Sequence, residues 1–304
     1  MQEEIKVDVT NLNIRIDTFI SGEIKELSRT YVQKLIKDGY VLVNGKQIKN
    51  NYKTILGDII LLNIPEAKGI DIVPEDIPLD IVYEDNDIIL VNKPKGMVVH
   101  PGAGHYNGTL VNALMYHCKN NLSGINGILR PGIVHRIDKD TTGIIIACKN
   151  DMSHKAIAEL LKSHSIVRRY RAIVNGVLQD DEGTIDKPIG RHPIDRKKNA
   201  VDAPKSKAAV THYKVLERFK NHTYIECQLE TGRTHQIRVH MAYINHPLLG
   251  DEIYGPKNKN PYHLQGQTLH AMVLGFNHPR TGQYMEFIAD LPAYFSELLS
   301  KLPK

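Results

Sequence analysis

The chain has 304 residues, is 41% hydrophobic and carries a formal net charge of +5. Those values suit one large domain or two ordinary ones with real hydrophobic cores. The three cysteines are single and widely spaced, which disfavours a disulfide framework or a zinc knuckle. No apolar run reaches the roughly 18 residues of a membrane helix, and the polar start lacks the order of a signal peptide. We therefore expect a cytoplasmic protein.

Charge is distributed unevenly along the chain. Basic residues outnumber acidic residues in 12–64 and again in 88–304, whereas acidic residues dominate 65–87. A basic region is the electrostatic footprint of a polyanion binder, although it also occurs in proteins that bind no nucleic acid. Charge alone does not decide between these two interpretations.

Residues 12–64 have the pattern of a small α+β module. Ser28 is placed to cap a helix with an apolar face, and Gly39 is placed to end it. The pair Asn44-Gly45 predicts a tight type I′ hairpin, and the stretch GDIILLNIP predicts a further strand. The proline-rich and acidic stretch that follows, 65–80, predicts an extended linker.

The rest of the chain, from residue 81, alternates short strands with a few helices. Helices are predicted in GTLVNALMYHC, in MSHKAIAELLKS with Asp151 or Ser153 as cap, and in THQIRVHMAYI with Thr234 as cap. Strands are predicted in DIVYEDNDIILVNKP, GIIIACKN, IVRRYRAIVNGVL, KAAVTHYKVLERF, HTYIECQLETG, LHAMVLGFNHP and QYMEFIAD. Because strands outnumber helices and hairpin turns link many of them, we predict an α+β domain with a mixed, largely antiparallel central sheet and flanking helices.

Two common cofactor patterns are missing from the sequence. His235 and His240 lie five residues apart, about 140° around a helix, so they do not face one metal site. The loop HPGAGHYNG lacks the Lys-Ser/Thr ending of a P-loop and the spacing of a dinucleotide fingerprint. We therefore expect no metal and no nucleotide cofactor.

Two dense charged segments remain as candidates for chemistry. In the first, HRIDKD, Asp138 and Asp140 are two residues apart and could point the same way, as a glycosidase carboxylate pair would, but a simple turn is the favoured interpretation of Asp140. In the second, GRTHQIR, Arg238 lies at the edge of a helix's buried face and needs an acidic partner. Asp138 is a candidate for that partner, and a carboxylate held ionised in a pocket can act as a nucleophile or a base.

Several longer stretches resemble the pseudouridine synthases of the branch with an HRLD-type motif. They are, in the expected order, VNKPKGMVVHPG, HRIDKDTTGIIIACKN, RRYRAIVNG, ETGRTHQIRVHMAYINHPLLGDEIYG and LHAMVLGFNHPRTG. HPGAG, GTLVNAL and PGIVHRIDKDTTG are most similar to the D type, which modifies large-subunit ribosomal RNA. The isoleucine of HRID and a shorter loop at GPKNKNPYHLQG depart from that pattern. The module at 12–64 resembles an S4-like RNA-binding domain.

This resemblance implies an enzyme that turns uridine into pseudouridine without a cofactor. Asp138 would be the catalytic carboxylate, Arg238 would pair with it, Tyr170 would stack on the base, and Arg136 would help to flip the uridine out of its stack. The implied organisation is an S4-like domain at 12–64, an acidic linker at 65–80 and a catalytic domain at 81–304. The implied RNA contacts are Arg15, Arg29, Lys34, Lys46, Lys53, His135, Arg233 and His235.

Two other functions compete with this interpretation. A non-catalytic RNA-binding or ribosome-assembly factor could use the same scaffold, although it would not need Asp138, Tyr170 and Arg238 together. A nucleoside or glycoside hydrolase would need Asp140 as its second carboxylate. The expected partner is large-subunit ribosomal RNA or its precursor, and we expect a monomer.

Overall fold

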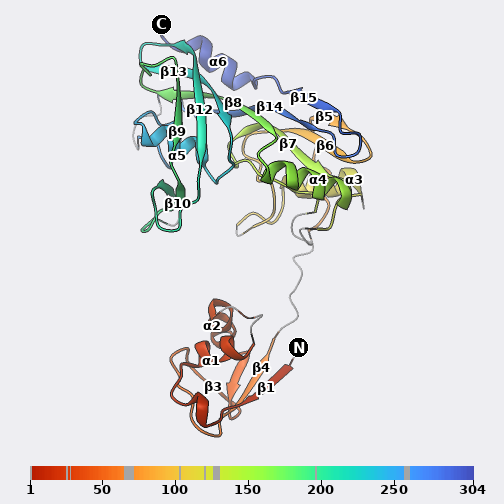
Figure 1. The fold of residues 1–304 in the computed structure, drawn as a ribbon, viewed down its shortest axis with the longest axis vertical. Coiled ribbons are helices and arrows are strands. Elements are labelled where there is room, and N and C mark those ends of the chain that lie inside the picture. Colours follow the sequence, from red (N-terminus) through yellow and green to blue (C-terminus); the bar gives the residue numbers. More distant parts are fainter. Residues whose placement is uncertain are drawn as a thin grey trace. The chain divides into compact units, whose positions relative to one another are not determined.

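The computed structural model describes residues 2–24, 27, 29–64, 72–102, 104–119, 121–125, 131–195, 197–256 and 261–304. Two compact units divide the chain, Met1–Gly69 and Ile70–Lys304 (Figure 1). The predicted cap Ser28 lies outside the described residues. Within them, no helix is both long enough and apolar enough to cross a lipid bilayer.

The first unit is a four-stranded antiparallel sheet packed against two helices. Its strands are β1 (Gln2–Lys6), β2 (Val41–Val43), β3 (Lys46–Gln47) and β4 (Ile59–Asn63), in the order β1-β4-β2-β3. Its helices are α1 (Ile16–Glu23) and α2 (Arg29–Lys37), and a short 3-10 helix, η1, spans Val9–Asn11. Asn44 and Gly45 both have positive φ, so the predicted type I′ hairpin is confirmed. β1 and α1 were not predicted.

The second unit is built on a nine-stranded mixed sheet. Its order is β5-β6-β7-β14-β8-β13-β12-β9, with β15 also paired to β14. Only the contact between β14 and β7 is parallel among the described strand pairs, so the predicted largely antiparallel sheet is confirmed. The strands are β5 (Ile81–Glu84), β6 (Ile88–Lys93), β7 (Thr142–Cys148), β8 (Val167–Asn175), β9 (Glu182–Asp186), β12 (Val210–Arg218), β13 (His222–Leu229), β14 (Leu269–Asn277) and β15 (Tyr284–Ile288).

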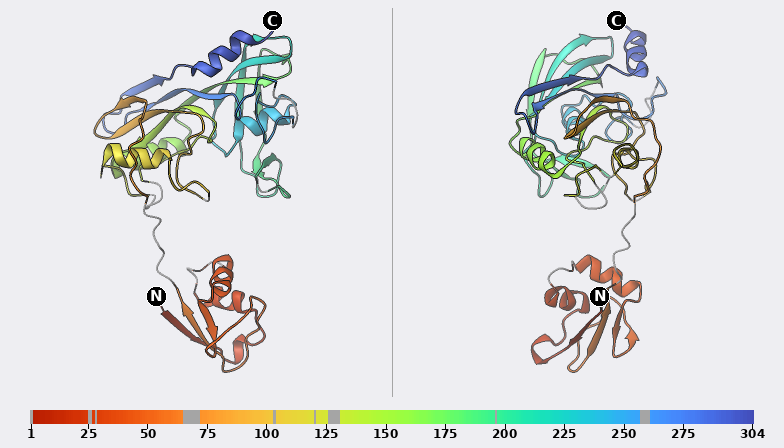
Figure 2. Two further views of the ribbon diagram at one scale, coloured as in Figure 1. Left: turned by 180° about the vertical axis from the view of Figure 1, so that it is seen from behind. Right: turned by 90° about the vertical axis from the view of Figure 1, so that its right-hand side faces the viewer.

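The described part of this unit also contains four helices and one separate hairpin. The hairpin is formed by β10 (Ile189–Arg191) and β11 (Asn199–Val201). The helices are α3 (Leu110–Cys118), α4 (Asp151–Lys162), α5 (Gln236–Tyr243) and α6 (Ala293–Lys301). α4 packs against β7, and α5 packs against β11 and β12 (Figure 2).

Both predicted caps of these helices were wrong. α4 is capped by Asn150, whose side chain accepts a hydrogen bond from the Ser153 backbone N–H at 3.0 Å. α5 begins after His235, which has φ +60° and makes no side-chain cap bond, so Thr234 is not the cap. The left-handed conformation of His235 separates Thr234 from the first turn of the helix. Residue type alone does not predict that a histidine adopts this conformation.

Strand β7 forms the rigid base for the loop that precedes it. All seven of its residues are buried, and its isoleucines pack into hydrophobic clusters on both faces of the sheet. Gly143 has φ +108°, and a Cβ atom there would lie 2.2 Å from the carbonyl oxygen of Ala271 in β14. Only glycine allows this close approach of two strands. The charged loop is therefore fixed to the centre of the sheet.

Candidate active site

Arg238 joins two carboxylates that come from different parts of the chain. Its Nη1 donates to Asp138 Oδ2 at 2.9 Å, which confirms the predicted contact. Its Nε and Nη2 donate to Asp251 Oδ2 and Oδ1 at 2.7 and 2.8 Å. The Asp251 side chain is fully buried, whereas 17% of the Asp138 side chain is exposed. Asp251 therefore anchors the guanidinium, and Asp138 is the partner that reaches the surface.

The charges of this group are strongly coupled. Burial opposes the charge of Arg238, but the hydrogen bond and charge of Asp251, together with Asp138, raise the pKa of Arg238 further above its ordinary value. Burial would also raise the pKa of Asp251, but Arg238 and two backbone N–H groups lower it overall. Arg238 is thus a permanent cation that holds Asp138 in one position.

His235 approaches the second oxygen of the same carboxylate. Its Nε2 lies 3.7 Å from Asp138 Oδ1, and its Nδ1 lies 2.9 Å from the hydroxyl oxygen of Tyr254. That oxygen also accepts the backbone N–H of Asn199 at 2.8 Å. A neutral imidazole with its proton on Nε2 would donate toward the carboxylate of Asp138 and accept the Tyr254 hydroxyl proton at Nδ1. Burial lowers the pKa of His235 despite the opposing charge of Asp138, which favours the neutral ring.

A cavity connects Asp138 with Tyr170 of β8. The Tyr170 side chain is buried, and burial raises the pKa of its hydroxyl group. Charged groups and apolar side chains line the cavity together: Arg136, Ile137, Asp138, Thr141, Tyr170, Leu229, Arg233, His235, Gln236, Ile237, Arg238 and Leu269. The structure therefore brings all four predicted catalytic residues, and two of the predicted RNA contacts, to one place. Apolar walls with a carboxylate among them suit a planar base with polar edges.

Lys93 ties the segment VNKPKGM to the loop of Asp138. The residue is fully buried, and its ammonium group donates to the carbonyl oxygens of Pro94, Met97 and Lys139 at 2.8, 2.8 and 3.0 Å. Burial lowers the pKa of Lys93 to about 7, against the opposing charges of Asp140 and Asp138. These three bonds position the backbone directly after Asp138.

Asp140 lies apart from the cavity that contains Tyr170. Among the described lining residues of that cavity, Asp138 is the only carboxylate. Asp140 lies against Gly266: a Cβ atom added to Gly266 would lie 2.6 Å from the Cβ atom of Asp140. A second, neighbouring cavity is lined by both carboxylates. Asp138 thus lines both cavities, whereas Asp140 lines only the one without Tyr170.

His135 differs from the predicted RNA contact. Its Nε2 accepts the backbone N–H of Ile146 in β7 at 3.2 Å. Burial, with a smaller contribution from the charge of Arg168, lowers the pKa of His135 to about 3. The ring is therefore neutral and supports β7, which argues against its use as a cation for RNA.

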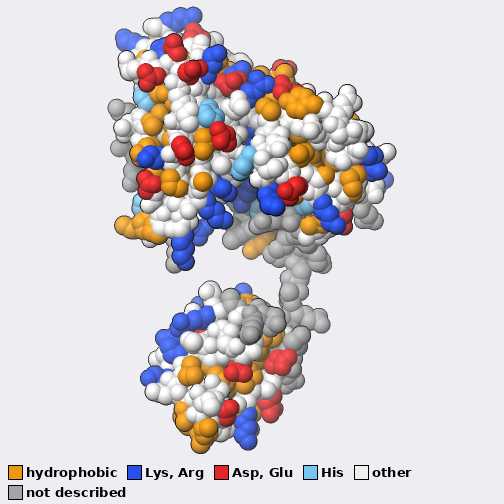
Figure 3. All heavy atoms as spheres, viewed as in Figure 1, with side chains coloured by type: hydrophobic (Ala, Val, Ile, Leu, Met, Phe, Trp, Pro, Cys, Tyr) orange, Lys and Arg blue, Asp and Glu red, His pale blue; other side chains and the backbone are white. Residues whose placement is uncertain are grey.

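The predicted bases of the first unit are all exposed, but two of them are paired. Arg15 Nη2 and Arg29 Nε contact the buried carboxylate of Asp17 at 3.1 and 3.0 Å. The remaining three are Lys34, Lys46 and Lys53. On the visible face of this unit, Lys and Arg gather mainly on one side and Asp and Glu on the other (Figure 3). The side of the unit that carries the Lys and Arg side chains thus suits a polyanion.

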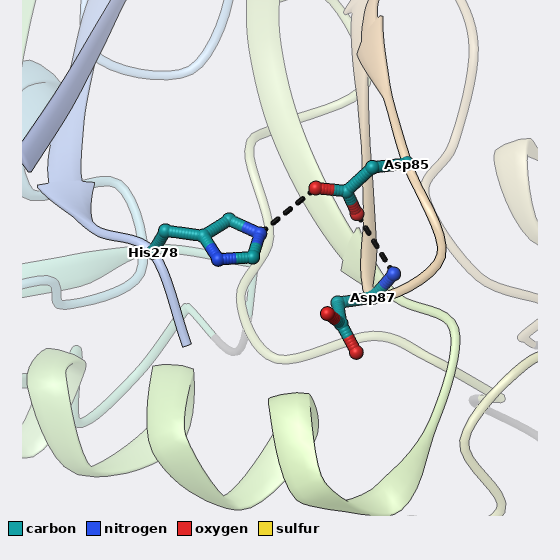
Figure 4. A group of neighbouring side chains, drawn as sticks. All are labelled: Asp85, Asp87 and His278. Atoms are coloured by element: carbon teal, nitrogen blue, oxygen red, sulfur yellow. Dashed lines mark hydrogen bonds and ion pairs between the residues drawn. The ribbon is translucent and has the colours of Figure 1, made fainter. Parts of the chain in front are cut away.

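Asp85, Asp87 and His278 form the one group of described side chains with metal-ligand spacing (Figure 4). Their oxygens are already occupied. Asp85 Oδ2 accepts from His278 Nε2 at 2.8 Å, and Asp85 Oδ1 accepts backbone N–H groups. Asp87 accepts from Arg280 at 2.6 Å through both oxygens and from Asn150 at 2.8 Å. Through these hydrogen bonds and ion pairs the group links the β5–β6 turn to the residues after β14. We interpret it as a structural contact rather than as a metal site.

Sequence reasoning missed Asp251 and Tyr254 as members of the site. Both lie in the stretch GDEIYG, which belongs to a motif that had already been singled out. A buried arginine with five donors can hold two carboxylates, so a second acid in that motif was the available signal.

Two family models match the chain. One, described as RNA pseudouridylate synthase, matches residues 87–243, and one described as S4 domain matches residues 14–60. An uncharacterized RNA pseudouridine synthase of Bacillus subtilis is 54% identical over 290 residues, which cover 95% of this chain and 94% of that protein. Ribosomal large subunit pseudouridine synthase D of Zymomonas mobilis is 45% identical over 300 residues, with 95% and 94% covered.

A solved structure supports the fold independently. Human RNA pseudouridylate synthase domain containing 1 covers 76% of this chain and 98% of its own, with a TM-score of 0.57 and 21% identity. At this level of identity the likeness concerns the fold alone.

Proposed function

Because the chain belongs to the RNA pseudouridylate synthase family, we propose that it converts uridines of large-subunit ribosomal RNA into pseudouridine, with Asp138 as the catalytic carboxylate. The observation that carries the proposal is the cavity in which Asp138, held by Arg238 at 2.9 Å, faces the same space as Tyr170. The matched synthase D of Zymomonas mobilis, named for the large ribosomal subunit, supports the choice of substrate.

The reaction moves the ribose from one atom of the base to another. The N1–C1′ bond of uridine breaks, the base turns, and a C5–C1′ bond forms. One proton leaves C5 and one is gained at N1, so nothing is oxidised or reduced. An ionised Asp138 can take part as a nucleophile or as a base, and Arg238 keeps it oriented toward the cavity.

The uridine must leave its stack before this chemistry can begin. Extrusion of a base costs a few kcal/mol, least where it is unpaired. The ring of Tyr170 in the cavity wall would replace the lost stacking, and Arg136 beside it would assist the extrusion. Cations near the cavity would hold the backbone during this step. All of these groups come from one chain, so we propose a monomer. We also propose that it acts in the cytoplasm, as expected from the sequence.

The S4 domain adds RNA affinity in this proposal, without contributing to the chemistry. Its exposed bases Lys34, Lys46 and Lys53 are not in the described ion pairs, so they are available for phosphates. A tether between two RNA-binding units raises the local concentration of the second one.

The test is pseudouridine mapping with matched variants. The purified chain is incubated with transcribed large-subunit RNA, and carbodiimide adducts are located by primer extension. Stops that are lost in Asp138→Asn but kept in Asp140→Asn support the proposal. Release of free uracil that depends on Asp140 would indicate a hydrolase instead. Absence of stops on both naked RNA and assembled subunits would favour a non-catalytic RNA-binding factor.

A further inference from the structure

Arg168 is a buried cation without a described carboxylate partner. It lies on β8 two residues before Tyr170, so both side chains point to the same face of the sheet. It is 7% exposed, its Nη2 donates to the carbonyl oxygen of Glu230 at 3.0 Å, and its Nε is buried without a hydrogen-bond partner. Among the described residues, no acidic group lies within 4.0 Å of its guanidinium.

Such an arrangement is costly in the free protein. A buried charge is normally paired, because the interior solvates it poorly. Burial lowers the pKa of Arg168, and the nearby charge of Arg233 adds to this effect. An arginine nevertheless stays charged in proteins, so its counter-charge must come from elsewhere.

The local backbone leaves room for this guanidinium. Gly232 follows β13, and a Cβ atom there would lie 2.6 Å from Arg168 Nη1. Any larger residue would push the guanidinium out of its present position. The glycine thus keeps Arg168 at the wall of the site.

Arg168 opens into a cleft that continues from the candidate active site. The cleft is shared with Asp138 and Tyr170, and it extends to Lys162 and His164 at the end of α4. Asp138 is its only acidic residue among the described lining residues, whereas its bases are Arg136, Lys162, Arg168 and Arg233. The cleft therefore attracts an anion, and the anion that enters with a uridine is the phosphodiester of its own strand.

We propose that Arg168 binds a backbone phosphate adjacent to the uridine that enters the cavity, an inference that rests on the proposed function. The charge of Arg168 at the wall of the cleft matches a phosphate, for which a guanidinium is well suited. A phosphate contact carries no sequence information but fixes the register of the strand. Arg168 would thereby place one nucleotide opposite Tyr170 and Asp138.

The first test is salt-dependent RNA binding by the full chain. All proteins carry Asp138→Asn, so that turnover does not interfere, and the probe is a large-subunit RNA fragment. Arg168→Met should weaken binding about tenfold and reduce the slope of log affinity against log salt by about one. Arg168→Lys should retain part of both. The control is Arg169→Met, because Arg169 points to the other face and pairs with Glu286 at 2.7 Å; it should change neither.

The second test changes the RNA instead of adding further protein variants. A single neutral methylphosphonate is placed at each linkage around the target uridine of the RNA. One linkage should weaken binding to the parent chain about tenfold and cause no further loss with Arg168→Met. If no linkage matters, or if Arg168→Met binds like its parent with the same salt slope, the phosphate site is refuted. If circular dichroism shows that Arg168→Met does not fold, the methylphosphonate series is measured with the parent chain and with Arg168→Lys. That series then decides whether the phosphate site exists.

The outcomes also separate this inference from the proposed function. Loss of affinity in Arg168→Met, with no pseudouridine made by the natural chain, would keep the phosphate site and remove the activity. Pseudouridine formation with an unchanged KM in Arg168→Met would keep the activity and remove the phosphate site.

Discussion

At the residue scale, the site depends on how the N–H donors of Arg238 are distributed between two carboxylates. Its Nε and Nη2 are taken by Asp251, so only Nη1 reaches Asp138. The pair of Asp138 and Arg238 could be predicted from the sequence because an arginine at the edge of a helix's buried face needs an acid. Asp251 was missed, although an arginine has five donors and can hold a second acid of the same motif.

Removal of Arg238 should therefore cost more than removal of Asp251. Arg238→Ala leaves two carboxylates without their cation, and a broken buried pair costs about 3–5 kcal/mol in the free energy of unfolding. Asp251→Asn leaves the guanidinium paired with Asp138 and should cost less. Both should lower turnover, by about 100-fold or more for Arg238→Ala, with little change in RNA affinity.

Urea denaturation measures the free energy of unfolding, pseudouridine formation measures turnover, and filter binding measures RNA affinity. The control is Arg218→Ala, because Arg218 forms an exposed pair with Asp181. Equal losses of turnover and affinity in Arg238→Ala would contradict the positioning role of Arg238.

His135 gives the protein a pH-dependent contribution to stability. Its pKa is lowered to about 3, mainly by burial, whereas an unfolded histidine titrates near pH 6.5. Its contribution is complete above about pH 6.5 and is lost as the pH falls toward 3, because only the unfolded chain then binds the proton. His135→Gln, which keeps an acceptor for Ile146, should reduce the slope of unfolding free energy against pH in that range by up to about 1.4 kcal/mol per unit. Urea denaturation at several pH values tests this, and identical slopes would contradict it.

Arg168 illustrates a signal that was present in the sequence but not used. In RRYR the residues alternate between the two faces of β8, so Arg168 and Tyr170 share one face and Arg169 and Arg171 share the other. Arg169 and Arg171 pair with Glu286 and Glu226 across the sheet. Period-two alternation separates these arginines, but the absence of an acid near Arg168 depends on the packed structure.

At the scale of elements, the strands with an apolar run or a clear alternation could be predicted, whereas β9, β10 and β11 could not. β6, β7, β8, β13 and β14 are apolar runs or clear alternations. β9, β10 and β11 contain few apolar residues and are defined by their partners, so periodicity carries little information about them. α6 was missed as well.

The contact of β7 with β14 depends on Gly143. Gly143→Ala would place a methyl group against the Ala271 backbone at a positive φ angle, so we expect the free energy of unfolding to fall by at least about 2 kcal/mol. Activity should fall too, because β7 carries the loop of Asp138. Gly124→Ala is the control, since a Cβ there meets nothing within 4 Å. Denaturation midpoints and turnover decide, and a stable, active Gly143→Ala would contradict the argument.

At the scale of the whole molecule, each unit has its own hydrophobic core. Deletion of residues 1–69 should therefore leave a folded second unit with its active-site groups intact. We expect weaker RNA binding with a flatter salt dependence, because cations that contact phosphates are lost. Filter binding at several salt concentrations measures this, with circular dichroism as the control for folding. Unchanged binding would show that the first unit does not contact the RNA.

The parallel pairing of β7 with β14 also sets an order of events during synthesis. The first unit is complete once Asn63 has been made, because its strands lie within the first 63 residues. The central sheet, by contrast, must wait for Leu269–Asn277 to be translated before β7 and β8 gain their shared neighbour. Such distant contacts form slowly, and domains fold as the chain emerges. The nascent protein would therefore acquire its small RNA-binding unit long before its catalytic centre exists.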